Sequence, residues 1–429
     1  MLLDAWLKRA GAERRSVPGV VTDSGTMTWG MLDGDASAVA RRLRQDGLAP
    51  GGRVGLVMPS GLEFATALFG ALRAGCVAVP VDPRLGPDDR DARLGGCDLV
   101  LEERAPSASS GVLRVEIPPR AMPETAIVVH TSGTTSAPKP IELTHANWWW
   151  SAAGSAVALG HDPHERWLCA MPLSHVGGLS IVIRAMIGGT TAILQPRFDA
   201  ERVAGDLAAP DGPTLISVVP TMLARLLDAG LRRPPALRAV LVGGGPIPPA
   251  LLERAQEAGV RCVTTYGMTE ACSQITTGGP PLFCTRVQIG DDGEILVQGP
   301  TVAPGAIADD GWLHTGDLGG RDDAGNLRVT GRLADTIVTG GENVAPAEVE
   351  AVLEAHPAVA EAGVHGRPDD EWGEAVVATV VLREGMHADA EDLRAHVRER
   401  LAPFKVPKAI AFAGALPRTA SGKLMRREL

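Results

Sequence analysis

A segment rich in hydroxyl groups that ends in a lysine is the first part of this 429-residue chain with the residue types for chemistry. It runs from Ala126 to Lys139, and its short apolar start is followed by Thr131, Ser132, Gly133, Thr134 and Thr135. Backbone N–H groups, hydroxyl donors and an ammonium suit an oligophosphate, and a glycine allows close backbone approach. The Gly-Lys-Ser/Thr of a Walker A loop is absent. These residues alone fit both a phosphate-binding loop and a plain turn between a strand and a helix.

Four further segments combine glycine with hydroxyl or charged residues. They are Tyr266 to Glu270 (YGMTE), Trp312 to Asp317 (WLHTGD), Gly331-Arg332, and Pro417 to Lys423 (PRTASGK). Lysine is scarce, with five residues among 41 basic ones, yet two of the five are Lys139 and Lys423, and the single tyrosine is Tyr266. A compact ammonium reaches a crowded phosphate or carboxylate where a planar guanidinium does not fit. Both lysines fit a crowded anionic site, and a solvated surface charge is the alternative.

The five segments, in this order along the whole chain, resemble the adenylate-forming superfamily of acyl-CoA synthetases and peptide-synthetase adenylation domains. The resemblance implies that Tyr266 stacks on adenine, Thr269 contacts the α-phosphate and Glu270 holds Mg²⁺. It also implies that Lys423 is catalytic. The glycines after Leu241 lack the spacing of a dinucleotide fingerprint and are assigned to the adenine-side loop. The implied nucleotide-binding set is Thr131, Ser132, Gly133, Thr134, Thr135, Lys139, Gly243, Gly244, Tyr266, Gly267, Asp317, Arg332 and Gly341.

The reaction implied by the resemblance has two half-reactions, with ATP, CoA and Mg²⁺ as cofactors. A carboxylate attacks the α-phosphorus of ATP, and the CoA thiol then attacks the acyl-adenylate. A small C-terminal domain is implied to rotate between the steps, presenting Lys423 first and the Gly340–Asn343 loop second. The sequence departs from the family pattern at four positions, which are Ser136 and Pro140 in the phosphate loop, Ser174 before His175, and Ala334 where Asp or Lys is usual.

The acid is indicated by four other stretches. These are 147–156, 167–181, 196–200 and 269–275, and they resemble o-succinylbenzoate-CoA ligases of menaquinone biosynthesis. Because that substrate has a second carboxylate, we expect Arg184 to pair with the one that does not react, with Ser273 and Thr277 as further substrate contacts and His175 near the reacting carboxylate. Two alternatives stay open. An arginine in an apolar helix also snorkels or pairs with a nearby acid, and His175 also fits a core position.

Alternating short apolar runs and helical patterns predict the fold. Strands are expected at 53–58, 76–81, 126–130, 167–171, 190–194, 214–218, 238–242 and 261–265, and helices at 62–74, 146–159, 221–229 and 249–258. This pattern is typical of βα units on a mostly parallel sheet. Hairpins follow from about Arg286, and after Arg332 come helices at 346–356 and 390–401 with strands at 359–364 and 375–382. We predict an α/β fold with a large N-terminal domain (1–332) of βα-layered subdomains plus a small β-rich subdomain, and a small mobile α+β C-terminal domain (333–429).

Composition limits the remaining function classes. The net charge is −10 and basic runs are absent, which argues against nucleic-acid and membrane partners. Six scattered cysteines do not suggest a metal cluster or disulfides. The apolar segments are too short to span a bilayer and the N-terminus does not resemble a signal peptide, so we expect a cytoplasmic enzyme acting on a small carboxylic acid, and a homodimer is compatible. Two alternatives are an adenylating enzyme that loads a carrier-protein thiol and a silent nucleotide-binding protein.

Overall fold

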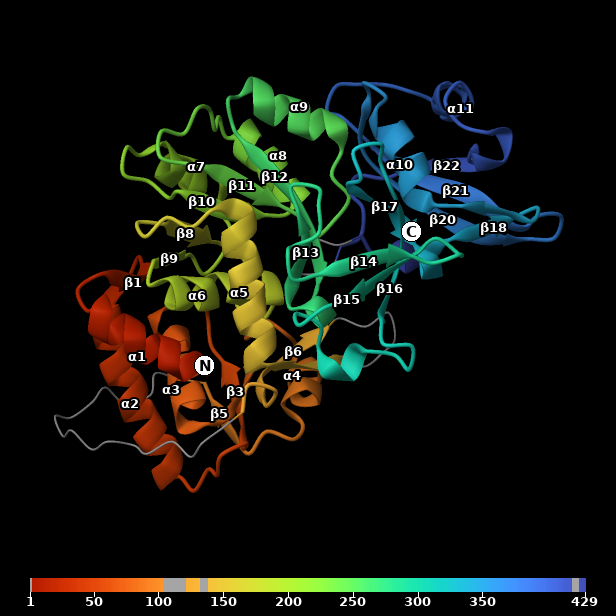
Figure 1. Ribbon diagram of the computed structural model, residues 1–429. Coiled ribbons are helices and arrows are strands. Elements are labelled where there is room, and N and C mark those ends of the chain that lie inside the picture. Colours follow the sequence, from red (N-terminus) through yellow and green to blue (C-terminus); the bar gives the residue numbers. More distant parts are fainter. Residues whose placement is uncertain (1, 103–120, 132–137, 419–423) are drawn as a thin grey trace.

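The computed structural model describes residues 2–102, 121–131, 138–418 and 424–429. Ser132, Gly133, Thr134, Thr135, Ser136 and Lys423 lie outside the described residues. Figure 1 shows α/β layers that contain the N-terminus, a β-rich region beside them, and a separate unit, coloured blue, that holds the C-terminus.

The larger α/β layer is built on a sheet with the order β13-β12-β11-β10-β8-β9-β1-β2. Its strands are β1 (Pro18–Thr22), β2 (Gly25–Thr28), β8 (Arg166–Cys169), β9 (Thr191–Leu194), β10 (Leu215–Val218), β11 (Ala239–Val242), β12 (Cys262–Met268) and β13 (Ser273–Thr277). Its helices are α5 (His145–Leu159), α6 (Val176–Gly188), α7 (Ala200–Ala208), α8 (Pro220–Asp228) and α9 (Pro249–Glu257). The inner pairs are parallel, and β2 and β13 pair antiparallel at the edges.

The second layer has the strand order β5-β3-β4-β6-β7. Its strands are β3 (Arg53–Val57), β4 (Val77–Val81), β5 (Leu99–Leu101), β6 (Thr125–Thr131) and β7 (Lys139–Thr144), with helices α1 (Leu3–Glu13), α2 (Trp29–Gln45), α3 (Leu62–Ala74) and α4 (Pro87–Leu94). Helices α2 and α3 pack closely because Gly70 has no side chain, and a Cβ there would lie 2.3 Å from Val39 Cγ1. A continuous buried core joins both layers.

The β-rich region is an antiparallel sheet of β14 (Arg286–Ile289), β15 (Glu294–Gln298), β16 (Leu313–Arg321) and β17 (Leu327–Arg332). The short helix η1 (Thr269–Ala271) links β12 to β13, and η2 (Pro304–Ala306) lies between β15 and β16. Residues of η1, β13 and this sheet share one core. The region therefore packs directly against the edge of the larger sheet.

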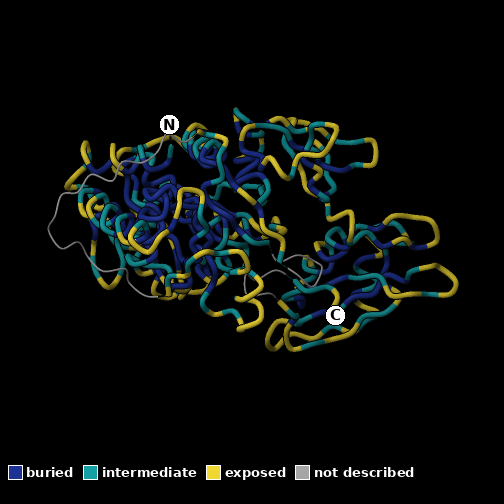
Figure 2. The backbone as a smooth tube through the Cα atoms, turned by 90° about the horizontal axis from the view of Figure 1, so that it is seen from below, coloured by how far each residue is buried: buried dark blue, intermediate teal, exposed yellow. Residues whose placement is uncertain are grey.

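The C-terminal unit follows η3 (Leu333–Asp335). It contains β18 (Ile337–Thr339), β19 (Glu342–Val344), α10 (Pro346–Glu354), β20 (Val359–Asp369), β21 (Gly373–Leu382), α11 (Ala390–Arg398), η4 (Pro403–Lys405), β22 (Ala409–Phe412) and η5 (Arg426–Glu428). Its buried apolar residues form their own cluster, seen in Figure 2 as a separate blue interior. A unit with its own core has the anatomy of a domain.

Most predicted elements match the structure. The helix at 62–74 has the predicted bounds, and the predicted strands and the other predicted helices agree at most ends to within two or three residues. The prediction missed the N-terminal block of α1, β1, β2 and α2. It also missed helices α4 and α7 and strands β5, β7, β13, β18, β19 and β22. No helix within the described ranges is long and apolar enough to cross a membrane.

Candidate active site

Tyr266, Asp317 and Arg332 meet although they come from three different strands. The Tyr266 hydroxyl donates a hydrogen bond to Asp317 Oδ2 at 2.8 Å, and Arg332 Nε lies 3.0 Å from Asp317 Oδ1. Burial, reinforced by the Asp317 carboxylate, raises the pKa of Tyr266, so the phenol is neutral and donates. A carboxylate has about four lone-pair sites, so Asp317 still has acceptor capacity for ribose hydroxyls. The structure thus brings together the residues expected at the adenosine.

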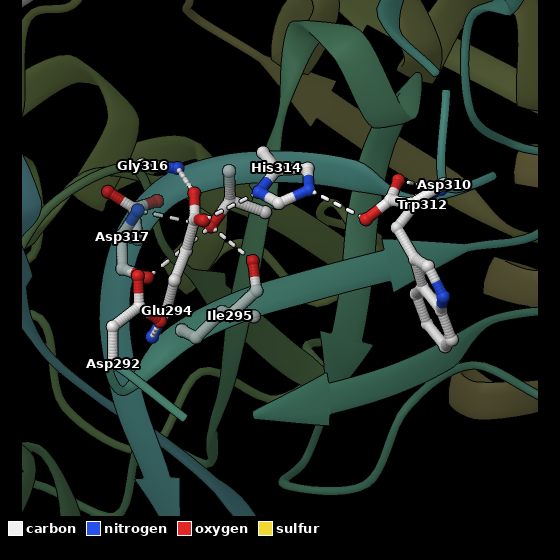
Figure 3. Close-up of polar contacts among 9 residues, drawn as sticks. Asp292, Glu294, Ile295, Asp310, Trp312, His314, Gly316 and Asp317 are labelled. Atoms are coloured by element: carbon white, nitrogen blue, oxygen red, sulfur yellow. Dashed lines mark hydrogen bonds and ion pairs between the residues drawn. The ribbon is translucent and has the colours of Figure 1, made fainter. Parts of the chain in front are cut away.

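Asp317 is oriented by a polar network in the β-rich region (Figure 3). The buried Glu294 accepts a hydrogen bond from the Gly316 N–H at 2.7 Å and lies 2.7 Å from His314 Nδ1, while His314 Nε2 lies 3.0 Å from Asp310. Hydrogen bonds to Asp310 and Glu294 raise the pKa of His314. Thr315 Oγ1 accepts from the Asp317 N–H at 3.1 Å and donates to the Ile295 carbonyl at 2.7 Å. The backbone that carries Asp317 is therefore held on both sides.

Thr269 and Glu270 lie in the short helix η1, next to this corner. The Thr269 carbonyl accepts from the Cys272 N–H at 3.0 Å, and the Glu270 carbonyl accepts from the Ala303 N–H at 2.8 Å. Within the described ranges there is no group of three or more His, Cys, Asp or Glu that would hold a metal alone. Mg²⁺ on a nucleotide needs only one or two protein carboxylates, because phosphates and waters complete its shell. A single carboxylate at Glu270 fits that donor set.

Glycine is required at two of the predicted positions, because another backbone segment lies too close to leave room for a side chain. A Cβ on Gly267 would lie 1.7 Å from the Ser273 carbonyl oxygen, and one on Gly243 would lie 2.6 Å from the Thr265 carbonyl oxygen. Gly244 has φ +81°, a left-handed conformation that favours glycine. The Gly243-Gly244 loop therefore lies against the strand that carries Tyr266.

The predicted phosphate segment begins in β6 and ends at the first residue of β7, and these two strands pair antiparallel. Thr131 at the end of β6 is the register partner of Lys139 at the start of β7, and the hydroxyl residues between them lie outside the described ranges. Lys139 is exposed. The alternative of a turn leading from a strand into a helix is wrong, because β7 intervenes before α5 begins at His145.

Arg184 on α6 is buried, and the described residues offer it no counter-ion. Arg184 is 8% exposed. Its Nη2 donates a hydrogen bond to Ser273 Oγ at 3.3 Å, and its guanidinium carbon lies 5.4 Å from the centroid of the Trp167 ring. In the part of the chain that the structure describes, no carboxylate pairs with it and its Nε has no hydrogen-bond partner. Burial lowers the pKa of Arg184 to about 10, so it remains charged at neutral pH. The side chain neither snorkels to solvent nor pairs with a described acid.

The turn that presents Ser273 to Arg184 is strained. Cys272 and Ser273 have φ of 51° and 95°, two consecutive non-glycine residues with positive φ. Such a conformation persists when its surroundings hold it. Here the buried Ser151 on α5 donates a hydrogen bond to the Cys272 carbonyl at 2.6 Å. Ser151 was missed in the sequence, where a serine in an apolar helix carries no distinguishing signal.

The other expected substrate residues are less closely placed. His175 precedes α6 and is only partly buried, so it is not a core histidine. Thr277 is buried at the far end of β13 from Ser273, and no contact among the described residues joins it to Arg184. Between them lies Gln274, which the sequence prediction omitted. It is 2% exposed, and neither end of its carboxamide has a described hydrogen-bond partner.

Gly340 and Gly341 form the turn between β18 and β19, with φ of 58° and 85°. The Gly340 N–H donates to the Trp372 carbonyl at 2.8 Å, and a Cβ on Gly340 would lie 2.9 Å from the Trp372 ring. The C-terminal sheet itself therefore holds this loop.

Two family matches cover most of the chain. The family described as AMP-binding enzyme matches residues 7–102 and 97–306, and the family described as AMP-binding enzyme C-terminal domain matches residues 348–423.

Relatives agree over the full length. The chain is 37% identical to a 2-succinylbenzoate–CoA ligase from Bacillus licheniformis, and the match covers 100% of both proteins. It is 39% identical to a 2-succinylbenzoate–CoA ligase from Geobacillus kaustophilus, and this match covers 99% of this chain and 96% of the relative. Among solved structures, it is similar to an o-succinylbenzoate CoA synthetase from Bacillus subtilis in complex with its acyl-adenylate intermediate. That likeness has a TM-score of 0.90 and 34% identity, covering 99% of this chain and 97% of the other. The structure of the same enzyme in complex with ATP and magnesium has a TM-score of 0.89 and 34% sequence identity. The match covers 99% of this chain and 98% of the other.

Proposed function

This chain belongs to the AMP-binding enzyme family, and we propose that it is an AMP-forming ligase that joins o-succinylbenzoate to CoA. It consumes o-succinylbenzoate, ATP and CoA and releases o-succinylbenzoyl-CoA, AMP and pyrophosphate. The fold and the full-length relatives support the reaction type. The acid is supported by one observation in particular, the buried Arg184.

A buried charge without a partner is costly, because the group loses its hydration and gains nothing in return. An anionic substrate group is the partner that Arg184 lacks, since Ser273 supplies only a neutral acceptor at 3.3 Å. A guanidinium binds a carboxylate through two parallel hydrogen bonds, and Nε is free of described partners. A simple fatty acid or benzoate has no second carboxylate to place there. We therefore assign Arg184 and Ser273 to the carboxylate that does not react, with Thr277 as a further substrate contact.

In the first half-reaction the reacting carboxylate attacks the α-phosphorus of ATP and pyrophosphate leaves. We assign adenosine binding to Tyr266, Asp317 and Arg332, whose contacts already converge. Mg²⁺, held by Glu270, would neutralise phosphate charge. Thr269, His175 and Lys423 are assigned to the reacting carboxylate and phosphoryl oxygens, and the segment ending at Lys139 to the departing phosphates. Positioning and electrostatics suffice for this transfer without an enzyme nucleophile.

In the second half-reaction the CoA thiol attacks the acyl carbonyl, loses its proton and displaces AMP. We assign the Gly340–Asn343 loop to this step and place the hinge at η3, directly after Arg332. That position makes residues 1–332 and 333–429 the two moving parts. Ala334 lies inside η3, where the family usually has Asp or Lys.

The decisive experiment is ATP–pyrophosphate exchange and CoA-dependent AMP release with a panel of acids. The panel contains o-succinylbenzoate, an analogue without the ring carboxylate, one without the chain carboxylate, and a fatty acid. We expect exchange and thioester formation with o-succinylbenzoate at the lowest concentration. Equal use of the monocarboxylic acids would contradict the assigned acid.

Two controls separate the alternatives. Thioester formation only with a holo-carrier protein would identify a carrier-loading enzyme, and no exchange with any acid would identify a silent nucleotide-binding protein. The homodimer and the cytoplasmic location stay predictions. Size-exclusion chromatography with light scattering tests the first, and cell fractionation tests the second.

A further inference from the structure

The C-terminal tail is tied down on both sides of the segment that carries Lys423. Before it, Arg418 Nη2 lies 2.8 Å from Glu361 Oε2 on β20. After it, Leu424 forms a β-bridge with Arg418, and the Met425 N–H donates to the Pro417 carbonyl at 2.9 Å. The two flanks of the lysine segment therefore meet each other and lie against β20.

Arg426 makes the most extensive of these contacts. Its Nη2 lies 2.6 Å from Glu350 Oε2 on α10, its Nη1 lies 3.4 Å from Asp335 Oδ2 in η3, and its Nε donates to the Val364 carbonyl on β20 at 3.2 Å. All three guanidinium nitrogens are thus used, each toward a different element. A planar, rigid group with this many directed bonds fixes orientation as well as position.

The partners of Arg426 are themselves well placed. Glu350 is 7% exposed, and its other oxygen accepts from the Val364 N–H at 2.8 Å, so the carboxylate is locked between α10 and β20. Asp335 closes η3, immediately after the hinge position Ala334. A single side chain therefore connects the tail to the domain interior and to the hinge.

The thiolation loop does not depend on these contacts. Its turn is held by the Gly340 N–H bond to the Trp372 carbonyl and by the pairing of Thr339 with Gly373. Among the described residues, the hydrogen bonds and ion pairs of Arg426 reach none of these four. The two loops that serve the two half-reactions are thus supported separately within one domain.

We propose that Arg426 is a positioning residue for the adenylation half-reaction, which sets the Lys423 loop relative to the hinge. The inference rests on the proposed function, because it needs Lys423 to act in adenylation. Loss of the Arg426 contacts releases the tail from η3 and α10, so Lys423 is no longer delivered in register with the bound nucleotide. Misplacement of a reacting group by about 1 Å costs about 100-fold in rate.

The test measures the two half-reactions separately on the full-length enzyme. ATP–pyrophosphate exchange reports adenylation, and CoA thioester formation from supplied o-succinylbenzoyl-adenylate reports thiolation. For Arg426→Ala we expect exchange to fall about 100-fold, as for a misplaced reacting group, with thiolation within about threefold of wild type. Lys423→Ala gives the reference pattern, loss of exchange with thiolation spared. Arg398→Ala, at an exposed arginine of α11 whose described partner is Glu391, is the control and should leave both rates unchanged.

Two further variants protect the test against simple misfolding. Arg426→Lys keeps the charge but not the three directed bonds, so exchange should recover only in part. Asp335→Asn keeps the bond to the buried Glu350 and weakens only the tie to η3, so exchange should fall, by less than in Arg426→Ala, while the domain stays folded. Equal loss of both half-reactions in Arg426→Ala, or unchanged exchange in both Arg426→Ala and Asp335→Asn, would overturn the proposal.

Failure of the proposed function would look different. In that case wild type itself would show no exchange with o-succinylbenzoate, and the Arg426 variants would be compared with the acid that wild type does activate. The ratio of the two half-reactions then still decides the role of Arg426.

Discussion

Arg184 and Arg426 are both largely withdrawn from solvent, yet their surroundings are opposite. Arg426 has two carboxylates and a carbonyl around its guanidinium, whereas Arg184 has one hydroxyl and the face of Trp167. The partners of Arg426 neutralise its charge without any substrate, whereas those of Arg184 do not. An arginine whose partners are all protein groups braces the fold, and a buried arginine that lacks an anion is suited to receive one. The comparison supports a structural role for Arg426 and the proposed binding role for Arg184.

The difference also has an energetic side. Desolvation of Arg184 is not offset by a described ion pair, so the N-terminal domain carries this cost in its ligand-free state, next to the strained pair Cys272-Ser273. Local strain of this kind occurs at functional sites and is held by the packing around it. Under the role proposed for Arg184, substrate binding relieves part of this cost and favours a dicarboxylic acid. Arg426 already has its partners, so a ligand that bound there would gain no comparable binding free energy.

The largest expected effect is on substrate selection by Arg184. We expect Arg184→Ala to raise KM for o-succinylbenzoate about 10- to 100-fold, the loss typical of a hydrogen-bonded charge, and to change KM for the analogue without the non-reacting carboxylate much less. Steady-state kinetics with both acids at saturating ATP checks this. A similar rise for both acids would remove Arg184 from the pocket.

Stability should change in opposite directions at the two arginines. Arg184→Met removes an uncompensated buried charge and should raise the Tm of the ligand-free protein. Arg426→Met leaves Glu350 buried without its partner and should destabilise the C-terminal domain by about 2 kcal/mol, after allowance for partial exposure. Calorimetry of both variants without ligands measures this. A lower Tm in Arg184→Met would contradict the idea that this arginine lacks a partner.

A smaller effect is expected at Ser151, which holds the strained turn. Ser151→Ala removes the 2.6 Å hydrogen bond to the Cys272 carbonyl and should raise KM for o-succinylbenzoate about tenfold, equivalent to about 1.4 kcal/mol, with little change in KM for ATP. Ser155→Ala on the same helix is the control, since the described residues offer Ser155 Oγ no hydrogen-bond partner. Equal changes in both KM values would indicate a general packing defect.

The smallest expected effect is a change in the pH dependence of stability when Glu354 is replaced. Glu354 lies on α10, near Glu350, Glu361 and Arg418. Burial raises the pKa of Glu354 to about 7, although the Ala362 N–H bond opposes this. Between its ordinary pKa and about 7 the folded protein holds a proton that the unfolded chain has lost, so this stability contribution is present at low pH and lost as pH rises through that window. Glu354→Gln should therefore be more stable than wild type at pH 8 and little changed at pH 4.5. Urea unfolding at both pH values measures this, and an equal gain at both would contradict the raised pKa.

The βα pattern was readable in the sequence because buried parallel strands are continuous apolar runs bounded by turns. Strand β7 escaped detection because Lys139 and Pro140 begin it and only Ile141 and Leu143 alternate as a strand should. Proline is tolerated there because β7 is an edge strand, a fact that only the strand order reveals. Helix α2 was missed altogether, although Thr28 caps it through the Met31 N–H.

The convergence of Tyr266, Asp317 and Arg332 was anticipated because their segments resemble the adenylate-forming superfamily in residue type and in order. The sequence by itself thus determined the family, the reaction type and the order of the segments. It did not decide that Arg184 lacks a described counter-ion, that Ser151 supports the turn beside it, or that Arg426 joins the tail to the hinge. Those properties depend on which groups are removed from water together, and desolvation is set by packing between segments far apart in the chain.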